Sequence, residues 1–375
     1  MQKKLIALAV AAVVTAPAFA QSNVTIYGRL DLGYSYWGSN VDSDVGNRNA
    51  IDSNGQKTSF LGFKGAEDLG NGLKAGFDMQ YRLNPDQGNF DGTGSRRDVF
   101  VYLNGGFGTV ALGRLTHFQD SLLTSVDPFG ASNLTGYGGS WTQGANLVGL
   151  LANEATASSV GDGGRTTRLD NVIAYISPNF SGLTVKAAFT KDGIGNESKG
   201  NEANLSATSL PDAQVWAISP VYQNGPLTVG ANYHEVELQS AQVGVDGIEE
   251  KVWDLAAAYD FGMVKLSAAY GQDKLTAAGE NLKVKQWFVG ASAPVGAAGK
   301  VALVYGQNEI DNESNSDTTR WALGYTHNLS KRTSVYAEYV DYDYEENGLG
   351  GIGKVGLGNS DGYERGLGVG LVHTF

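Results

Sequence analysis

The chain has 375 residues, among them 52 glycines, 3 methionines, 8 prolines and no cysteine, and its formal net charge is −12. The absence of cysteine excludes a disulfide framework, a thiolate metal site and a cysteine nucleophile. The acidic balance gives no electrostatic reason to bind nucleic acid. A mean hydropathy of −0.21 excludes a helical membrane protein. A barrel with a wet lumen tolerates such polarity, because every second strand residue faces water.

The first twenty residues have the three parts of an export signal. Two lysines form a positive start, residues 5–14 form an apolar core, and Ala18-Phe19-Ala20 is a small-x-small cleavage site. The apolar core is too short to span a bilayer as a helix. We therefore predict a signal peptide at 1–20 and a mature barrel at 21–375, whose formal charge becomes −14 once the two lysines are removed.

The first mature strand is predicted at 24–36 and has a period of two. Its apolar side chains share one face, and the other face carries Arg29 and Asp31. An arginine facing lipid near the midplane would cost about 2–4 kcal/mol, so we predict that both charges face a lumen. No later stretch offers eighteen uncharged apolar residues, so any membrane crossing must use strands.

The same alternation recurs along the chain as hairpins. In 73–83, for example, Lys74, Asp78 and Arg82 fall on the inward phase, and Asn71-Gly72 before them is a typical two-residue hairpin turn. Such short turns alternate with long polar stretches, which is the asymmetry of an outer-membrane barrel. The long stretches are 37–56, 84–95, 116–165, 192–212, 236–249, 273–280, 309–317 and 343–362.

The pattern predicts an all-β fold, a 16-stranded antiparallel transmembrane β-barrel. The number is even, as single-chain bacterial barrels require, and large enough to leave an aqueous lumen. Helices are disfavoured because glycine is too frequent for helix interiors. The predicted strands are 24–36, 57–69, 73–83, 96–104, 109–115, 166–177, 183–191, 213–222, 227–235, 250–261, 263–272, 281–293, 300–308, 318–329, 333–342 and 363–375.

The third long stretch, 116–165, is far longer than its neighbours and only weakly charged. It contains Asp120 and the sequence Asp127-Pro128-Phe129-Gly130, and 115–126 could form a short helix. A loop this long and apolar is better satisfied packed on the inner wall, where it would narrow the pore. The alternative interpretation is a disordered external loop.

Basic residues are predicted to face this loop from the wall. Arginines cannot lose their charge, so a row of them opposite Asp120 and Asp127 would set a permanent field across a water-filled constriction. For each arginine the alternative is a salt bridge between strands. Arg29, Arg82 and Arg114 are assigned inward by phase, one of the adjacent Arg96 and Arg97 must face inward, and Arg168 opens the strand after the loop.

The last segment, 363–375, ends on an aromatic residue. Leu367, Val369, Leu371, His373 and Phe375 share one face, and small residues occupy the other. In a bilayer the aromatic would lie at the headgroup level, and the strand could close a barrel against the first. The alternative is the edge strand of a soluble sandwich.

Several motifs carry a resemblance to a known family. The chain resembles a Gram-negative general diffusion porin of the β-proteobacterial type over its whole mature length. The motifs are V-T-I-Y-G-R-L-D at 24–31, L-G-F-K-G-A-E-D-L-G at 61–70, G-G-F-G-T-V-A-L-G-R at 105–114, Y-I-S-P-N-F-S-G-L at 175–183, N-L-S-K-R-T at 328–333 and the terminal L-V-H-T-F.

The resemblance implies an outer-membrane homotrimer with one pore per subunit, open to small hydrophilic solutes and ions. It also implies periplasmic chaperones and a barrel-insertion machinery as partners, the latter reading Phe375 as an assembly signal. At matching positions, Arg29, Arg97 and Arg168 correspond to the family's arginine cluster. Asp127 corresponds to the acidic residue of the loop tip, although the order of its neighbours differs.

One position departs from the family pattern, because Phe60 stands where the family usually has arginine. The row of arginines therefore has one member fewer than the family pattern. The net charge of −14 favours cations, but much of it lies in external loops, where salt screens it within about 8–10 Å. Fixed positive groups outnumber negative ones at the constriction by phase, so we expect weak anion selectivity.

Other functions were weighed against a general channel. A substrate-specific channel shares the predicted fold, and a closed adhesin predicts an obstructed lumen. A barrel hydrolase needs a nucleophile, a base and an orienting group together, and the four histidines offer no such set, so no catalytic residue is predicted. No cofactor or metal is expected, although the acidic stretches 311–317 and 341–346 could bind Ca²⁺ loosely at the outer mouth.

Overall fold

The structure is a computed structural model of the whole chain. It describes residues 24–38, 47–90, 96–135, 168–191, 212–239, 248–277, 279–345 and 364–375. The predicted signal peptide and most of the predicted external loops lie outside the described residues. In the part that is described, no helix is long and apolar enough to cross a membrane.

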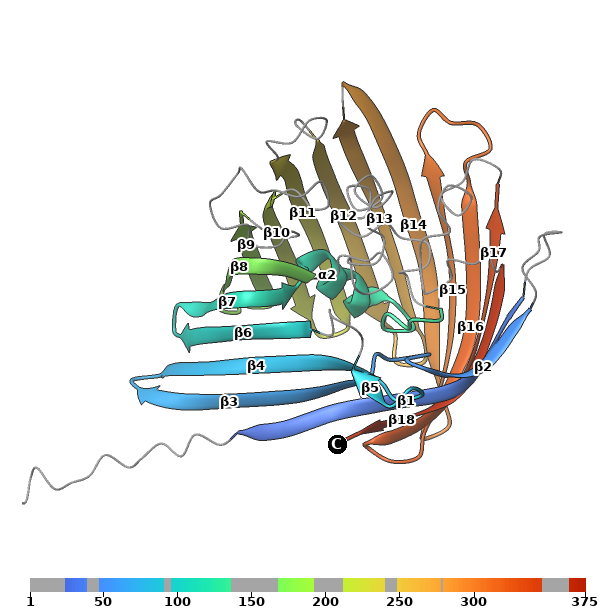
Figure 1. Cartoon of the computed structure of the whole chain (residues 1–375), viewed down its shortest axis with the longest axis horizontal. Helices are drawn as coiled ribbons and strands as arrows, with labels where there is room; N and C mark the ends of the chain where they lie inside the picture. Colours follow the sequence, from blue (N-terminus) through green and yellow to red (C-terminus); the bar gives the residue numbers. More distant parts are fainter. Residues whose placement is uncertain are drawn as a thin grey trace, which may run out of the picture.

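Sixteen of the described strands form a closed antiparallel ring, in which β1 pairs with β18 on one side and with β3 on the other (Figure 1). This confirms the sixteen-stranded barrel. The ring strands are β1 (Thr25–Gly38), β3 (Phe60–Gly70), β4 (Leu73–Asn84), β6 (Arg96–Gly105), β7 (Gly108–Thr116), β8 (Arg168–Ile176), β9 (Leu183–Thr190), β10 (Asp212–Asn224), β11 (Leu227–Gln239), β12 (Glu249–Asp260), β13 (Lys265–Ala277), β14 (Glu280–Val295), β15 (Gly299–Ile310), β16 (Thr318–Asn328), β17 (Thr333–Tyr344) and β18 (Arg365–Thr374).

The ring closes where the two ends of the described chain meet. Gly28 and Phe375 exchange both backbone hydrogen bonds, each 3.1 Å long. The Phe375 ring lies directly over Gly28, where an added Cβ would come within 2.6 Å of its Cζ atom. The terminal aromatic is therefore part of the seam between the first and last strands, as the sequence predicts for the closing strand.

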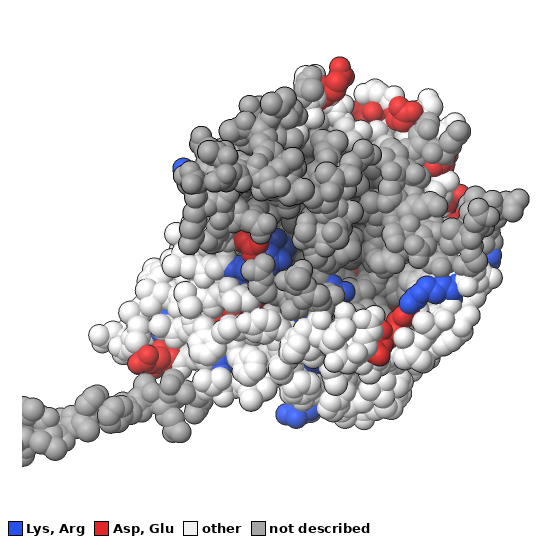
Figure 2. Space-filling model, in the orientation of Figure 1, with Lys and Arg blue, Asp and Glu red and all other residues white. Residues whose placement is uncertain are grey.

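The two faces of the wall differ as the period of two predicts. On β18, Leu367, Val369 and Leu371 are 39–48% exposed on the outer face, whereas Gly368 and Val372 are buried on the inner face. Figure 2 shows an outer wall that is mostly free of charged side chains, with most of the charged residues nearer its margins. Such a wall suits lipid outside and water inside.

Aromatic pairs form a regular band on part of the outer face. In each of four successive hairpins, from β10–β11 to β16–β17, a tryptophan packs against a tyrosine with ring centroids 5.0–5.6 Å apart. Tryptophan and tyrosine are the residues that favour the headgroup level of a bilayer. The pairs are Trp216–Tyr233, Trp253–Tyr270, Trp287–Tyr305 and Trp321–Tyr339.

Three predicted loops contain more strand than expected. Two short strands lie within the predicted loops 37–56 and 84–95: β2 (Arg48–Ser53) pairs with the outer half of β1, and β5 (Asn89–Phe90) pairs with β4. The predicted loop at 273–280 is wrong, because β13 and β14 pair as far as Ala277 and Glu280. Polar residues on both faces there let the hairpin extend in water beyond the apolar wall.

Candidate pore constriction

The segment after β7 turns into the barrel, as predicted for the third loop. His117 caps the helix α2 (Phe118–Val126), and its Nδ1 accepts a hydrogen bond from the Gln119 backbone N–H at 3.2 Å. Leu122, Leu123 and Val126 form the buried face of this helix. The helix packs on β10 to β13 inside the ring (Figure 1). Residues 136–165 of the predicted loop lie outside the described residues.

Four glycines of the inner wall lie directly beneath side chains of this loop, and we call them the docking glycines. An added Cβ would meet the loop at 2.4–2.7 Å, closer than real Cβ contacts allow. The loop therefore packs where the wall carries no side chain. The pairs are Gly230 of β11 under Leu122, Gly290 of β14 under Pro128, Gly324 of β16 under Phe129 and Gly368 of β18 under Leu134.

Three lysines hold α2 and the chain that leaves it: Lys265 and Lys300 of the wall, and Lys57 of the segment before β3. Each donates to a backbone carbonyl: Lys57 Nζ to Phe129 O at 3.0 Å, Lys300 Nζ to Pro128 O at 2.8 Å and Lys265 Nζ to Ser125 O at 3.3 Å. Helix C-termini carry partial negative charge, which cations stabilise. No sequence motif marks these lysines, because their partners are backbone atoms far away in the sequence.

Asp127 closes the helix rather than standing free in the lumen. Its carboxylate accepts from the backbone N–H of Phe129 at 3.2 Å and of Ala131 at 2.7 Å, and the residue is buried. Lys57 and Lys300 lie close enough for their positive charges to attract the Asp127 carboxylate. The sequence predicted that Asp127 faces Arg29, Arg97 and Arg168. In the structure its carboxylate instead accepts from backbone N–H groups at the loop tip.

A row of arginines on the opposite wall surrounds Phe60. In the ladders of β1, β3 and β4, Phe60 lies directly between Arg29 and Arg82, so all three share the inner face as predicted. The guanidinium carbons of Arg29 and Arg97 stand 5.3 and 5.6 Å from the centre of the Phe60 ring, within cation–π range. Phe60 thus separates cations that would otherwise repel one another.

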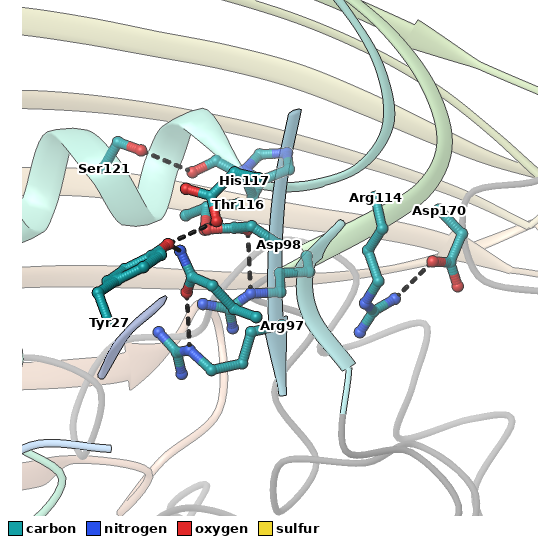
Figure 3. A network of polar contacts seen from close by, with 11 residues as sticks. Tyr27, Arg97, Asp98, Arg114, Thr116, His117, Ser121 and Asp170 are labelled. Carbon is teal, nitrogen blue, oxygen red and sulfur yellow. Dashed lines mark hydrogen bonds and ion pairs between the residues drawn. The ribbon is translucent and has the colours of Figure 1, made fainter. Parts of the chain in front are cut away.

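A β-bulge brings two adjacent residues of β6 to the inner face. The β4–β6 register shifts between Met79 and Tyr81, opposite Arg97 and Asp98. Arg97 Nε donates to Gln80 Oε1 at 3.4 Å, and Asp98 accepts from Arg168 Nε at 3.2 Å (Figure 3). Arg168 is therefore buried and paired with Asp98. This is the salt bridge between strands that was the alternative role for each arginine.

Arg114 does not face the lumen, contrary to its predicted phase. It lies across from Val99 in the β6–β7 ladder, in step with the exposed outer pair Val101 and Leu112. Its guanidinium pairs with Asp170 at 2.7 Å, apart from the other arginines (Figure 3). The ion pair reduces the cost of charge on the outer face. Asp120 lies in the first turn of α2 and is partly buried.

Two buried histidines join the helix start to the wall. The rings of His117 and His234 pack edge to face with centroids 4.3 Å apart, and neither Nε2 atom has a hydrogen-bond partner. His234 of β11 contacts Asn232, which donates to Asp254, and Lys186 of β9 lies over the neighbouring Phe118 ring. No carboxylate contacts either ring in the part of the chain that the structure describes.

We predict that acid loosens this contact. Burial lowers the pKa of His117 to about 4, below its ordinary value of 6.5. The docked loop thus binds fewer protons, and the titration of His117 costs docking up to about 3 kcal/mol as the pH falls from 6.5 to 4. Single-channel records should show more frequent closures over that window. His117→Asn should flatten the profile and the exposed His373→Asn should not; an unchanged profile in His117→Asn contradicts the prediction.

The closed ring, the apolar outer wall and the charged, loop-lined interior define a transmembrane channel. A family model described as Gram-negative porin matches residues 7–347. The chain is 34% identical to outer membrane porin protein 32 of Delftia acidovorans over 100% of both chains. It is 30% identical to an outer membrane porin of Bordetella pertussis over 90% of this chain and 93% of that one.

Among solved structures, an anion-selective porin from Comamonas acidovorans matches with a TM-score of 0.74 and 30% identity, covering 95% of this chain and 100% of that one. The chain belongs to the Gram-negative porin family, as its motifs indicate. It is an outer-membrane β-barrel that forms a water-filled channel for passive diffusion of small hydrophilic solutes and ions.

Proposed function

We propose that this channel weakly prefers anions. The observation that carries the proposal is the inner-face row of Arg29, Arg82 and Arg97 around Phe60. The loop carboxylate of Asp127 accepts from the backbone N–H groups of Phe129 and Ala131, which leaves less negative charge to oppose the row. The anion-selective description of the related Comamonas porin supports the same preference.

Reversal potentials in a salt gradient test this proposal. Arg29→Gln and Arg97→Gln should each shift the wild-type potential toward cations. One charge several ångströms from the ion is worth about 0.6 kcal/mol in water, or a two- to threefold change in the permeability ratio. The double variant Arg168→Gln/Asp98→Asn removes a neutral pair and should change little. A cation-selective wild type, or no shift in both single variants, would overturn the proposal.

We further propose that the channel carries no catalytic activity and needs no cofactor. Each of the four histidines is within the described residues, and no described serine hydroxyl bonds to an imidazole. A serine hydrolase would use that contact. Of the acidic stretches considered for Ca²⁺, Asp311 is paired with Lys285 at 2.7 Å and Asp317 accepts from Gln307, so these carboxylates already have protein partners.

The outer face supports a homotrimer. The described Trp–Tyr pairs lie on β10 to β17, whereas β1 to β8 show none in the described residues. The latter strands expose Val101 and Leu112 beside the Arg114–Asp170 ion pair. A wall without these Trp–Tyr pairs, but with a charge pair among apolar residues, is suited to protein neighbours rather than lipid.

We expect unboiled protein to migrate on gels as a trimer and to collapse to one band on boiling. The chain has no cysteine, so single cysteines can map the contact without background. A bismaleimide should cross-link Val101→Cys into dimers and trimers, but should leave Leu255→Cys on β12 monomeric after boiling. Both residues are 55% exposed, which makes them a matched pair. Monomers in mild detergent, or equal cross-linking of both variants, would contradict the trimer.

A further inference from the structure

The patch around Phe60 combines aromatic rings with cations on the lumen wall. Phe60 packs edge to face with Tyr27 at a centroid distance of 5.5 Å, and Lys64 Nζ stands 4.6 Å from the centre of the Tyr27 ring. Phe60, Tyr27 and Arg29 are only partly buried, so part of each faces the lumen. A passing solute therefore meets apolar ring surface and positive charge together.

The charge of Arg29 is left for a solute. Its Nε donates to Thr58 O at 3.0 Å, and its guanidinium faces the Phe60 ring. The nearest carboxylate in sequence, Asp31, instead accepts from Gln56 N, Lys57 N and Tyr336. No ion pair engages Arg29 within the described part of the chain, so its two terminal nitrogens can donate to an incoming carboxylate.

The carboxylates nearest the rings are likewise occupied. Asp78 accepts from the hydroxyl of Tyr27, and Asp98 accepts from Thr116 at 2.8 Å and from Arg168. These contacts hold the acids beside the patch rather than against Arg29. The patch thus offers a positive donor fork beside an aromatic ring, with the Arg29 guanidinium carbon 5.3 Å from the Phe60 ring centre.

We propose that Arg29, Phe60 and Tyr27 form a weak binding site for small aromatic carboxylates in transit. The carboxylate would accept from the terminal nitrogens of Arg29, and the ring would pack against Phe60 or Tyr27. Aromatic pairs prefer edge-to-face or offset geometry and add attraction beyond the area they bury. An aliphatic carboxylate gains the charge contact alone. This inference rests on the proposed anion preference and names a solute class for it.

Planar-bilayer recording with two matched probes tests the proposal. Benzoate and cyclohexanecarboxylate carry the same charge and similar bulk, and only benzoate is aromatic. Benzoate should half-block the chloride current at a concentration about three- to tenfold lower, which is the range that an aromatic pair contributes. Phe60→Leu should shrink the difference between the probes, since only Tyr27 then remains for the ring, and Phe60→Tyr should keep it.

Phe63→Leu is the matched control, because Phe63 lies on the same strand and pairs with Ile26 of the outer face. It should keep the wild-type preference. Equal block of the wild type by both probes would overturn the site while leaving the anion preference intact. A channel that prefers cations would fail the proposed function instead, and the reversal potential separates the two. The wild-type comparison stands even if Phe60→Leu fails to fold.

Discussion

Gly290→Ala should sharply reduce the current through single channels. The new Cβ would lie 2.4 Å from Pro128 Cγ, so either the wall or the loop must move. The paired strands of the wall are stiff, and we therefore expect the loop to shift into the lumen. Overpacking of this kind costs about 1–3 kcal/mol, enough to populate displaced loop positions that narrow or block the pore. Single-channel conductance of purified, folded protein is the measurement.

A size exchange distinguishes loop displacement from general misfolding. Pro128→Ala removes the atoms that the new Cβ would meet, so the double variant Gly290→Ala/Pro128→Ala should recover conductance. Gly106→Ala, at a turn where no atom lies within 4 Å of the added Cβ, should behave as wild type. Normal conductance in Gly290→Ala alone would show that the loop does not rest on this glycine.

Deleting Phe375 should cause the largest loss of assembled protein. The deletion removes both backbone hydrogen bonds to Gly28 and the ring that covers it, at the seam where the barrel closes. The β1–β18 pairing from Arg29–Thr374 onward remains, but the Gly28 N–H and C=O at the end of the seam lose their partners, which is costly where no water satisfies them. The yield of folded protein in outer-membrane fractions should fall severalfold, with the remainder degraded or aggregated in the periplasm.

Phe375→Ala separates the backbone contribution from that of the ring. It keeps the two hydrogen bonds to Gly28 and loses only the aromatic contact. If cellular machinery reads the aromatic end, Phe375→Ala should fail in cells yet refold in detergent, whereas the deletion should be impaired in both. Wild-type yield of the deletion at normal expression would reject the role of this residue.

The alternation of side chains along the sequence was enough to predict the ring and its two faces. A lipid-facing charge is expensive, so Arg29 and Arg82 could be assigned to the lumen from their phase alone, and both lie on the inner face beside Phe60. The length and composition of the third loop likewise predicted that it enters the barrel. These inferences succeeded because they depend only on which residues need burial. Along a strand, the buried face recurs at every second residue.

Phase failed where the backbone departs from regular pairing. The β6 bulge turns both Arg97 and Asp98 inward, and no alternating pattern can place two neighbours on one face. Arg114 was misassigned for a different reason: it lies two residues beyond the outward Leu112, so regular alternation itself places it on the outer face, where it pairs with Asp170. Bulges arise from the fit between adjacent strands, which a single strand's sequence does not record.

Tertiary structure alone decided how the constriction loop is held. The docking glycines and the loop side chains above them lie more than a hundred residues apart in sequence, and a glycine in a strand gives no sign of what will cover it. Lys57, Lys265 and Lys300 bind backbone carbonyls, which every residue possesses and no motif marks. The sequence determined that a loop must enter this barrel, because its apolar residues need burial. Where the loop rests, and which charges remain for a solute, depended on contacts that exist only once the wall has closed around it.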